Sequence, residues 1–292
     1  MSLSHRVTEI LERLQDIIED WYNGTFAGKT IITDGTDDAR VTNGGLDVNI
    51  QDQTTEIIDL HLSQLVQEID IVTNTSIGDS TITISSAAEP TDGNNICLKE
   101  GTAFYQGHII SHVANASNWD VTLDTPLDFA FTTEGGCSER IENLAVDGSI
   151  TPQSFFVSPK GLASGTKWDI TRILGVIVDA EAMDDSKFGG ITGGLTKGVV
   201  FRKKDGVYKN IFAVRTNGDL AAHMYDVTYT DATRGPAGNE SLRFRRTFGG
   251  QDKAGVVIRL DADSNDEFEC IIQDDLTGLV DFQIIAQGHV VE

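Results

Sequence analysis

The clearest chemical signal in the sequence is an oxygen-rich run at 261–267, which reads Asp-Ala-Asp-Ser-Asn-Asp-Glu. Its candidate metal ligands are Asp261, Asp263, Asn265 and Asp266. Oxygen ligands at alternate positions are typical of the first half of a calcium loop. The run departs from the EF-hand because an acidic residue replaces the glycine of the sharp turn, and Ile272 stands where a bidentate Glu would close the site. Calcium binding and an ordinary Asp- and Asn-rich hairpin turn are therefore both open hypotheses, and no other cofactor is predicted.

Other groups with catalytic potential are scattered. His108 and His112 are four residues apart on an expected strand, so they would share one face, but no Cys or carboxylate lies close by in sequence. We expect a structural or surface role for them. The sequence contains no G-x-S-x-G nucleophile motif and no phosphate-binding loop with a following Lys-Ser/Thr. Carboxylate pairs are common in so acidic a chain, which keeps a glycan-degrading enzyme as an alternative.

The charge balance narrows the range of partners. The chain has 45 acidic and 22 basic residues and a formal net charge of −23. Such a surface repels phosphate backbones and anionic membranes, so neither nucleic acid binding nor membrane insertion is expected. Cys97, Cys137 and Cys270 are isolated and form no C-x-x-C motif, so neither a zinc site nor a disulfide framework is expected. Free cysteines of this kind favour folding in a reducing cytoplasm. The first residues contain no apolar signal core.

The elements that would position these groups are mostly strands. Apolar, β-branched runs flank Asp205-Gly206 and Asn217-Gly218, dipeptides that suit two-residue hairpin turns. They predict a three-stranded antiparallel meander over 198–229. Further strands are expected at 141–147, 153–158, 168–179, 242–248, 255–260, 267–273 and 282–291. With a long Gly-rich loop at 180–195, these make 140–292 a jelly-roll-like antiparallel β-sandwich.

The region before the sandwich divides into three parts. Residues 1–24 are expected to form an amphipathic helix for assembly or docking, since apolar residues recur with heptad spacing. The residues of this oligomerisation seam are Leu3, Val7, Ile10, Leu14, Ile17 and Trp21. Residues 25–69 are expected to form a linker with short strands at 30–33 and 46–50 and a second helix at 54–69. Residues 70–139 are expected to form a small β module, with strands at 81–85, 96–99, 103–113 and 120–123.

Three stretches resemble a widespread, poorly characterised group of tailed-bacteriophage structural proteins. They are LDVNIQDQTTEIIDLHL at 46–62, WDITRILGVIVDAEAMDDSKFGG at 168–190 and FECIIQDDLTGLVDFQIIAQGHVVE at 268–292. The group has no catalytic motif that could be matched residue by residue. The resemblance implies a virion part with an N-terminal attachment element, outward β domains and no active site.

Together these observations predict a mainly β, non-enzymatic virion component of tail, baseplate or fibre type, assembled in the host bacterial cytoplasm. Its expected partners are other virion proteins, further copies of itself (with a trimer favoured) and a host-surface glycan. A capsid decoration or collar protein is the second hypothesis. A glycan-degrading enzyme is the third.

Overall fold

The computed structural model describes residues 57–224, 226–230, 239–248 and 258–291, together with the backbone of three short strands before them. The chain divides into two compact units, Met1–Thr55 and Glu56–Glu292. In the first unit the described strands form one antiparallel sheet in the order β1-β2-β3. These strands are β1 (Ile32–Thr33), β2 (Asp38–Thr42) and β3 (Gly45–Val48).

Two predictions for the first unit can be compared with these strands. The strand expected at 30–33 is present over its last two residues, and the strand expected at 46–50 is present as β3. The predicted helix at 1–24, with its seam of Leu3, Val7, Ile10, Leu14, Ile17 and Trp21, lies outside the described residues.

The predicted helix at 54–69 is wrong. The described part of that segment forms two strands, β4 (Ile57–His61) and β5 (Gln64–Ile71). The apolar residues there fit both a helical and an alternating pattern, and burial follows the alternating one. Ile58, Leu60 and Leu62 are buried, whereas Ile57 is 77% exposed.

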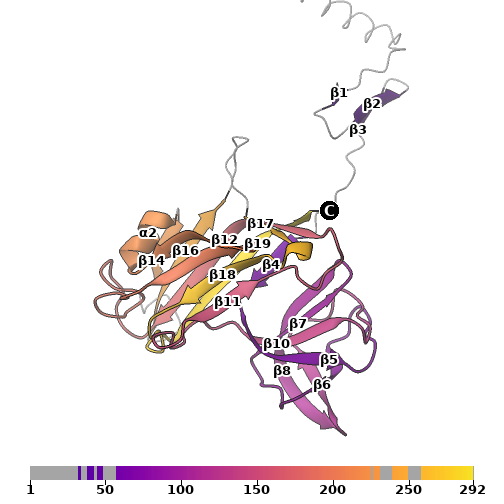
Figure 1. The fold of residues 1–292 in the computed structure, drawn as a ribbon, viewed down its shortest axis with the longest axis horizontal. Helices are drawn as coiled ribbons and strands as arrows, with labels where there is room; N and C mark the ends of the chain where they lie inside the picture. Colours follow the sequence, from indigo (N-terminus) through magenta and orange to yellow (C-terminus); the bar gives the residue numbers. More distant parts are fainter. Residues whose placement is uncertain are drawn as a thin grey trace, which may run out of the picture. The chain divides into compact units, whose positions relative to one another are not determined.

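The second unit contains a closed six-stranded antiparallel barrel in the order β10-β5-β6-β9-β8-β7 (Figure 1). All four strands predicted for the small β module are confirmed, and β5 and β10 close the barrel around them. Inward-facing aliphatic side chains such as Ile84, Ile96 and Val121 fill the interior and are fully buried. The strands that join β5 are β6 (Thr81–Ser86), β7 (Asn95–Glu100), β8 (Ala103–Asn115), β9 (Asn118–Leu123) and β10 (Gly136–Ile141).

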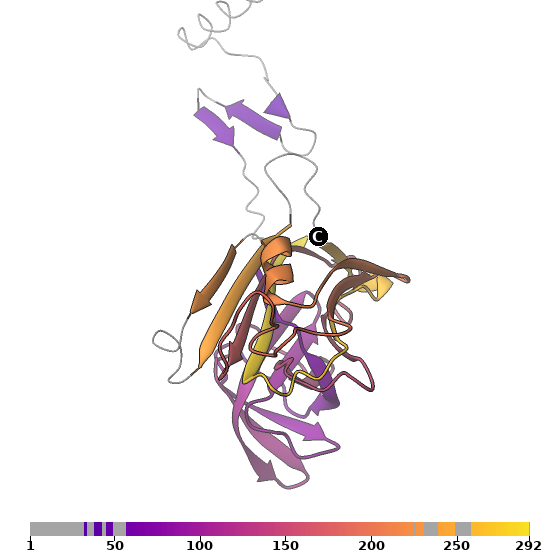
Figure 2. The same cartoon turned by 90° about the vertical axis from the view of Figure 1, so that its left-hand side faces the viewer.

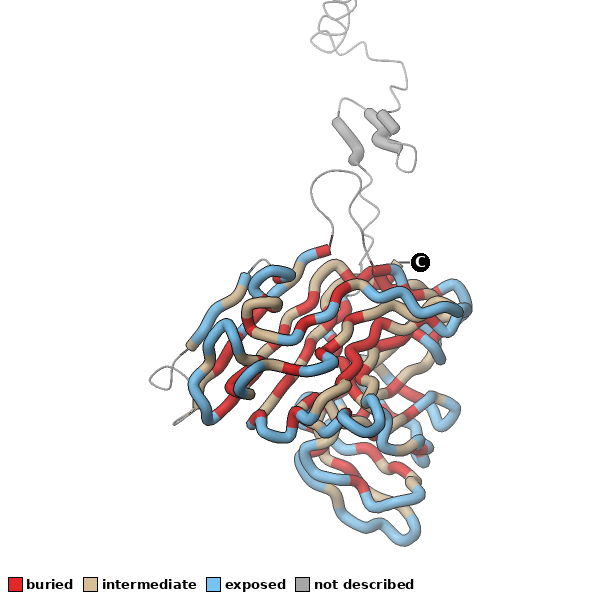
Figure 3. Tube along the Cα trace, turned by 60° about the vertical axis from the view of Figure 1, so that its left-hand side comes forward, coloured by how far each residue is buried: buried red, intermediate tan, exposed pale blue. Residues whose placement is uncertain are grey.

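The rest of the second unit is built on two antiparallel sheets, one of four strands in the order β11-β18-β13-β14 and one with the order β15-β16-β12-β19-β4. A further strand, β17, pairs with β12. We call this part the sandwich, because both sheets contribute to one large apolar core. In Figure 3 the buried stretches run along the strands and the exposed ones lie mostly in the connections. The remaining strands are β11 (Gln153–Val157), β12 (Lys167–Asp179), β13 (Val199–Lys204), β14 (Tyr208–Val214), β15 (Asp226–Thr230), β16 (Glu240–Thr247), β17 (Ile258–Asp261), β18 (Glu267–Ile272) and β19 (Asp281–Val291).

Only the first half of the predicted meander is confirmed. β13 and β14 pair across Asp205-Gly206, where Gly206 has a φ of +81°. The loop has three residues and not the predicted two, because Lys204 pairs with Tyr208. The predicted turn at Asn217-Gly218 instead begins a short helix, α2 (Asn217–His223), which lies beside β15 and β16 (Figure 2). Thr216 caps this helix by accepting a hydrogen bond from the amide of Asp219.

Contacts distant in sequence explain why Asn217 begins a helix. Its buried side-chain amide donates to the carbonyl of Gly189, and its side-chain oxygen accepts from the amide of the same residue. Gly189 belongs to the stretch at 180–195, which contains no helix or strand, as predicted. The strand expected at 141–147 is a further error, since β10 ends at Ile141 and the chain continues without regular structure to β11.

The barrel is inserted into the sandwich. β4 pairs with β19 in the larger sheet, the next six strands build the barrel, and the chain then returns to the smaller sheet through β11. Phe104 of the barrel packs against the sandwich core, with its ring centroid 5.2 Å from that of Trp168. The barrel is thus joined to the sandwich by two chain connections and by side-chain contacts.

Candidate functional site

A cavity of about 410 Å³ lies where the outer wall of the barrel meets the sandwich. Barrel strands β5, β7 and β10 supply one side of its lining and strand β11 with the loop after it supplies the other. Its volume falls within the roughly 300–1,000 Å³ that is usual for small-molecule sites. The exposed residues Leu65, Lys160 and Gly161 belong to the lining, so the cavity is open to solvent there.

Lys99 enters the cavity from β7. Its ammonium donates to the main-chain carbonyls of Ser158 and Lys160, the second at 3.0 Å, and so joins the barrel to the loop after β11. The same ammonium lies 5.5 Å from the ring centroid of Trp168. Burial lowers the pKa of Lys99 to about 8, because the charged form loses solvation that these neutral partners only partly replace.

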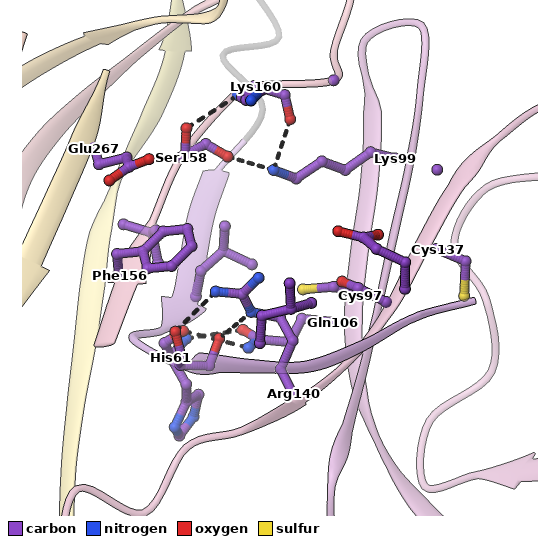
Figure 4. Close-up of a pocket in the computed structure, with 18 of the residues that line it drawn as sticks. His61, Cys97, Lys99, Gln106, Cys137, Arg140, Phe156, Ser158, Lys160 and Glu267 are labelled. Carbon is purple, nitrogen blue, oxygen red and sulfur yellow. Dashed lines mark hydrogen bonds between the residues drawn. The ribbon is translucent and has the colours of Figure 1, made fainter. Parts of the chain in front are cut away.

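Arg140 enters the cavity from β10, on the side opposite Lys99 (Figure 4). Its Nε donates to the hydroxyl of Ser63 at 2.7 Å, and one terminal nitrogen donates to the carbonyl of Ser63 at 2.8 Å. The guanidinium stacks over the ring of Phe156, 4.5 Å from its centroid. Burial also lowers the pKa of Arg140, although the group remains charged at neutral pH.

Neither cation has a carboxylate partner within 4.0 Å in the described part of the chain. Other half-buried cations of the sandwich do have one, as in Arg202–Glu269 and Lys204–Glu267, the latter pair at 3.1 Å. Two acidic residues, Glu68 and Glu267, also line the cavity. Lys204 already pairs with Glu267, and Glu68 attracts both cavity cations from beyond 4.0 Å. One remaining carboxylate against two cations leaves the lining a positive balance at Lys99 and Arg140.

Aromatic rings and neutral polar groups complete the lining. Phe156 and Trp168 supply the apolar surfaces, and the side chain of Gln106 bridges to the main chain of His61 by accepting at 2.8 Å and donating at 3.3 Å. Trp168 is fully buried, and its indole N–H has no hydrogen-bond acceptor. A buried donor without an acceptor costs free energy, so an acceptor at this position would be stabilising.

A histidine–carboxylate network begins beside the cavity at His61. Its Nδ1 lies 3.1 Å from Glu142, whose other oxygen lies 2.7 Å from Nε2 of His108. The Nδ1 of His108 lies 2.9 Å from Asp124, so this imidazole bridges two carboxylates. Burial lowers the pKa of His108, but the hydrogen bonds to Glu142 and Asp124 outweigh burial and raise the pKa above its usual value.

His108 and His112 do not share a face, contrary to the expectation from their spacing. A β-bulge between Ile109 and Ser111 inserts an extra residue in β8 and reverses the side to which the following residues point. His112 contacts a separate pair of carboxylates, Glu89 and Asp92, at 2.9 and 2.8 Å. The two histidines therefore serve two distinct ionic networks.

The His108 network predicts a pH-dependent stability. The pKa of His108 is raised in the folded state, so its ionic hydrogen bonds stabilise the fold fully below the unfolded-state pKa of about 6.5. This stabilisation is lost as pH rises through the folded-state pKa. We expect His108→Gln to flatten the decline in the free energy of unfolding as pH rises above about 6.5, measured by urea denaturation. Ser111→Ala, a change at an exposed residue of the same strand that has no titratable group, is the control and should leave the slope unchanged. An unchanged slope in His108→Gln would contradict this account.

The predicted calcium ligands lie in and beside the short 3₁₀-helix η1 (Ala262–Ser264). Asp261 caps it by accepting from the amide of Asp263, and Asp263 in turn accepts from the amide of Gly165 at 2.9 Å. Asp266 lies 3.2 Å from the ammonium of Lys203, and Asn265 adopts a left-handed backbone conformation. Within the described ranges no three Asp, Glu, His or Cys side chains gather as a metal site requires. The geometry is that of a hydrogen-bonded turn, and it adds no support to calcium binding.

Glu267 and Glu269 form a pair of neighbouring carboxylates on β18. Burial raises the pKa of Glu269, as does the nearby Glu267, whereas Arg202 opposes the shift. Arg202 and Lys204 stand directly opposite these two acids on β13. The arrangement is a ladder of cross-strand ion pairs, a stabilising device in antiparallel sheets.

The sequence analysis missed Lys99, Arg140 and Trp168 as site residues. They belong to three different strands, and no local motif links them. Their residue types did not single them out either, since basic residues occur on several other strands, among them Arg202, Lys203 and Lys204 of β13.

Comparisons with known proteins identify no relative: no family model, no curated protein and no solved structure matches the chain. In the part of the chain that the structure describes, no helix is long and apolar enough to cross a membrane.

Proposed function

We propose that this protein is a non-enzymatic structural component of a tailed-phage virion, of tail, baseplate or fibre type, with an outward β domain that binds a host-surface glycan or a neighbouring protein. The observation that carries the proposal is the insertion of a closed barrel into a β-sandwich, joined by Lys99, Arg140 and Phe104. These contacts fix the orientation of the barrel relative to the sandwich and leave an open cavity between them. Binding surfaces are commonly built in this way, at the boundary of rigid modules.

The proposal includes a jelly-roll-like class for the sandwich. From β11 to β13 the chain alternates between the two sheets, and β18 returns to lie between β11 and β13. A late strand inserted between two early ones is the long-range pairing of Greek-key and jelly-roll folds. We further propose that residues 1–24 assemble copies of the chain, most simply as a trimer, or dock it to another virion protein.

The copy number of the chain in purified particles tests the location. We expect few copies for each particle by quantitative mass spectrometry, and antibody labelling at the tail, because a tail tip needs few copies. Many copies distributed over the shell would favour the decoration or collar alternative. A chain absent from washed particles would contradict the virion assignment itself.

Host binding is tested by competition. The purified full chain should reduce phage adsorption to host cells in a saturable manner, whereas the same chain denatured by heat should not. Full adsorption at saturating protein would remove the host-binding part of the proposal and leave the structural part.

A further inference from the structure

We propose that the cavity between barrel and sandwich binds an acidic sugar, that is, a hydroxylated ring that carries a carboxylate. This inference rests on the proposed host-surface role and names the chemical class of the ligand. Two observations carry it: two cations without carboxylate partners, and a lining that combines an aromatic ring with neutral polar groups.

The two cations indicate an anionic ligand. Lys99 and Arg140 approach the cavity from opposite sides, with Phe156 and Cys97 at the remaining two sides in Figure 4. In a chain with 45 acidic residues, carboxylate partners are abundant, yet the described residues place none within 4.0 Å of either cation. The hydrogen bonds of both cations go to neutral oxygens, which leaves further N–H donors for a ligand. A carboxylate between them would supply the missing counter-charge.

The remaining lining fits a sugar ring. Phe156 offers an apolar surface, while the side chains of Gln106 and Ser138 offer hydrogen-bonding groups for hydroxyls. Sites of this kind combine a mostly apolar wall with a few polar groups that fix the orientation of the ligand.

The acidic residues of the lining favour a ligand that carries one negative charge on each sugar ring over a ligand that concentrates two charges on one group. Glu68 and Glu267 line the cavity together with the cations, so a doubly charged phosphate would meet more repulsion than a carboxylate would. The planar fork of Arg140 also matches a carboxylate in two parallel hydrogen bonds. A phosphate is also an anion, and the experiment below distinguishes a carboxylate ligand from a phosphate ligand.

Isothermal titration calorimetry of the full chain tests the inference. The probes are digalacturonate, its neutral counterpart digalactose, and inorganic phosphate. We expect saturable binding of digalacturonate and little binding of digalactose. Arg140→Gln should weaken digalacturonate binding about tenfold or more, the usual effect of losing a charged hydrogen bond. The control is Arg243→Gln, which removes an exposed arginine of the larger sheet and should leave affinity unchanged. Thermal unfolding verifies that both variants fold.

A measurement on the unaltered chain covers the case in which Arg140→Gln fails to fold. Affinity for digalacturonate should fall as pH rises from 7 to about 9.5, because Lys99 then loses its proton. No binding of digalacturonate to the folded chain, equal binding of digalactose, or binding of phosphate alone would each overturn the inference. If the full chain competes for phage adsorption but does not bind digalacturonate, the proposed function stands and only the assignment of an acidic sugar as the ligand is rejected.

Discussion

Replacing Trp168 by alanine is expected to lower the free energy of unfolding by about 3–5 kcal/mol, the usual cost of removing a large buried aromatic side chain. The indole is fully buried near the start of β12, where it contacts both the sandwich core and Phe104 of the barrel. Its loss leaves a cavity that the surrounding strands cannot close without moving the barrel. Guanidinium denaturation followed by circular dichroism measures the effect.

Trp119→Ala is the matched control for this variant. Trp119 is half-buried at the end of the β8–β9 hairpin, where it contacts the ring of His112. We expect Trp119→Ala to lower the free energy of unfolding by clearly less than Trp168→Ala does, since solvent already reaches the Trp119 side chain. Equal losses for the two variants would show that Trp168 does not join the modules in the way that the packing implies.

Gly288→Ala is expected to destabilise the sandwich by about 1–3 kcal/mol or more, because the added methyl group has no space. A Cβ at this position would lie 1.9 Å from the carbonyl oxygen of Asp169 on the neighbouring strand. The contact is with backbone, so relief requires β12 and β19 to separate near the bulge between Ile170 and Arg172. These two strands make the longest pairing in the larger sheet, and their separation would weaken the centre of the fold.

Gly278→Ala provides the comparison for Gly288→Ala, since a Cβ at Gly278 meets no atom within 4 Å. Thermal unfolding of both variants should show a clear decrease in Tm for Gly288→Ala and almost none for Gly278→Ala. Similar Tm values for the two proteins would mean that β12 and β19 adjust more easily than their close approach indicates.

The sequence predicted elements well where local chemistry decides the structure. The hairpin at Asp205-Gly206 forms as expected because Gly206 supplies the positive φ, although its loop has three residues where two were predicted. The turn at Asn217-Gly218 has the same local signal, but the buried hydrogen bonds of Asn217 to Gly189 select a helix there. Those partners are 28 residues apart in sequence, and no local pattern encodes them.

The segment at 54–69 shows a different limit. Its apolar residues satisfy two periodicities at once, and the choice depends on β19, which offers β4 a partner edge from the far end of the chain. The cavity could not be predicted for a related reason. Lys99, Arg140 and Trp168 become neighbours only when the barrel is set into the sandwich, a relation that emerges from the whole fold.

The pairing of β4 with β19 also sets an order of events during protein synthesis. Asp59 stands opposite Gln287, and their side chains form a hydrogen bond across 228 residues of sequence. All six barrel strands leave the ribosome long before β19 does, so the barrel can close while β4 still lacks its partner. In that interval β4 is an unpaired hydrophobic strand, with Ile58, Leu60 and Leu62 uncovered. A nascent chain with an early-folding barrel and an exposed edge is one on which chaperones act, and we infer that it is most prone to aggregation just before β19 emerges.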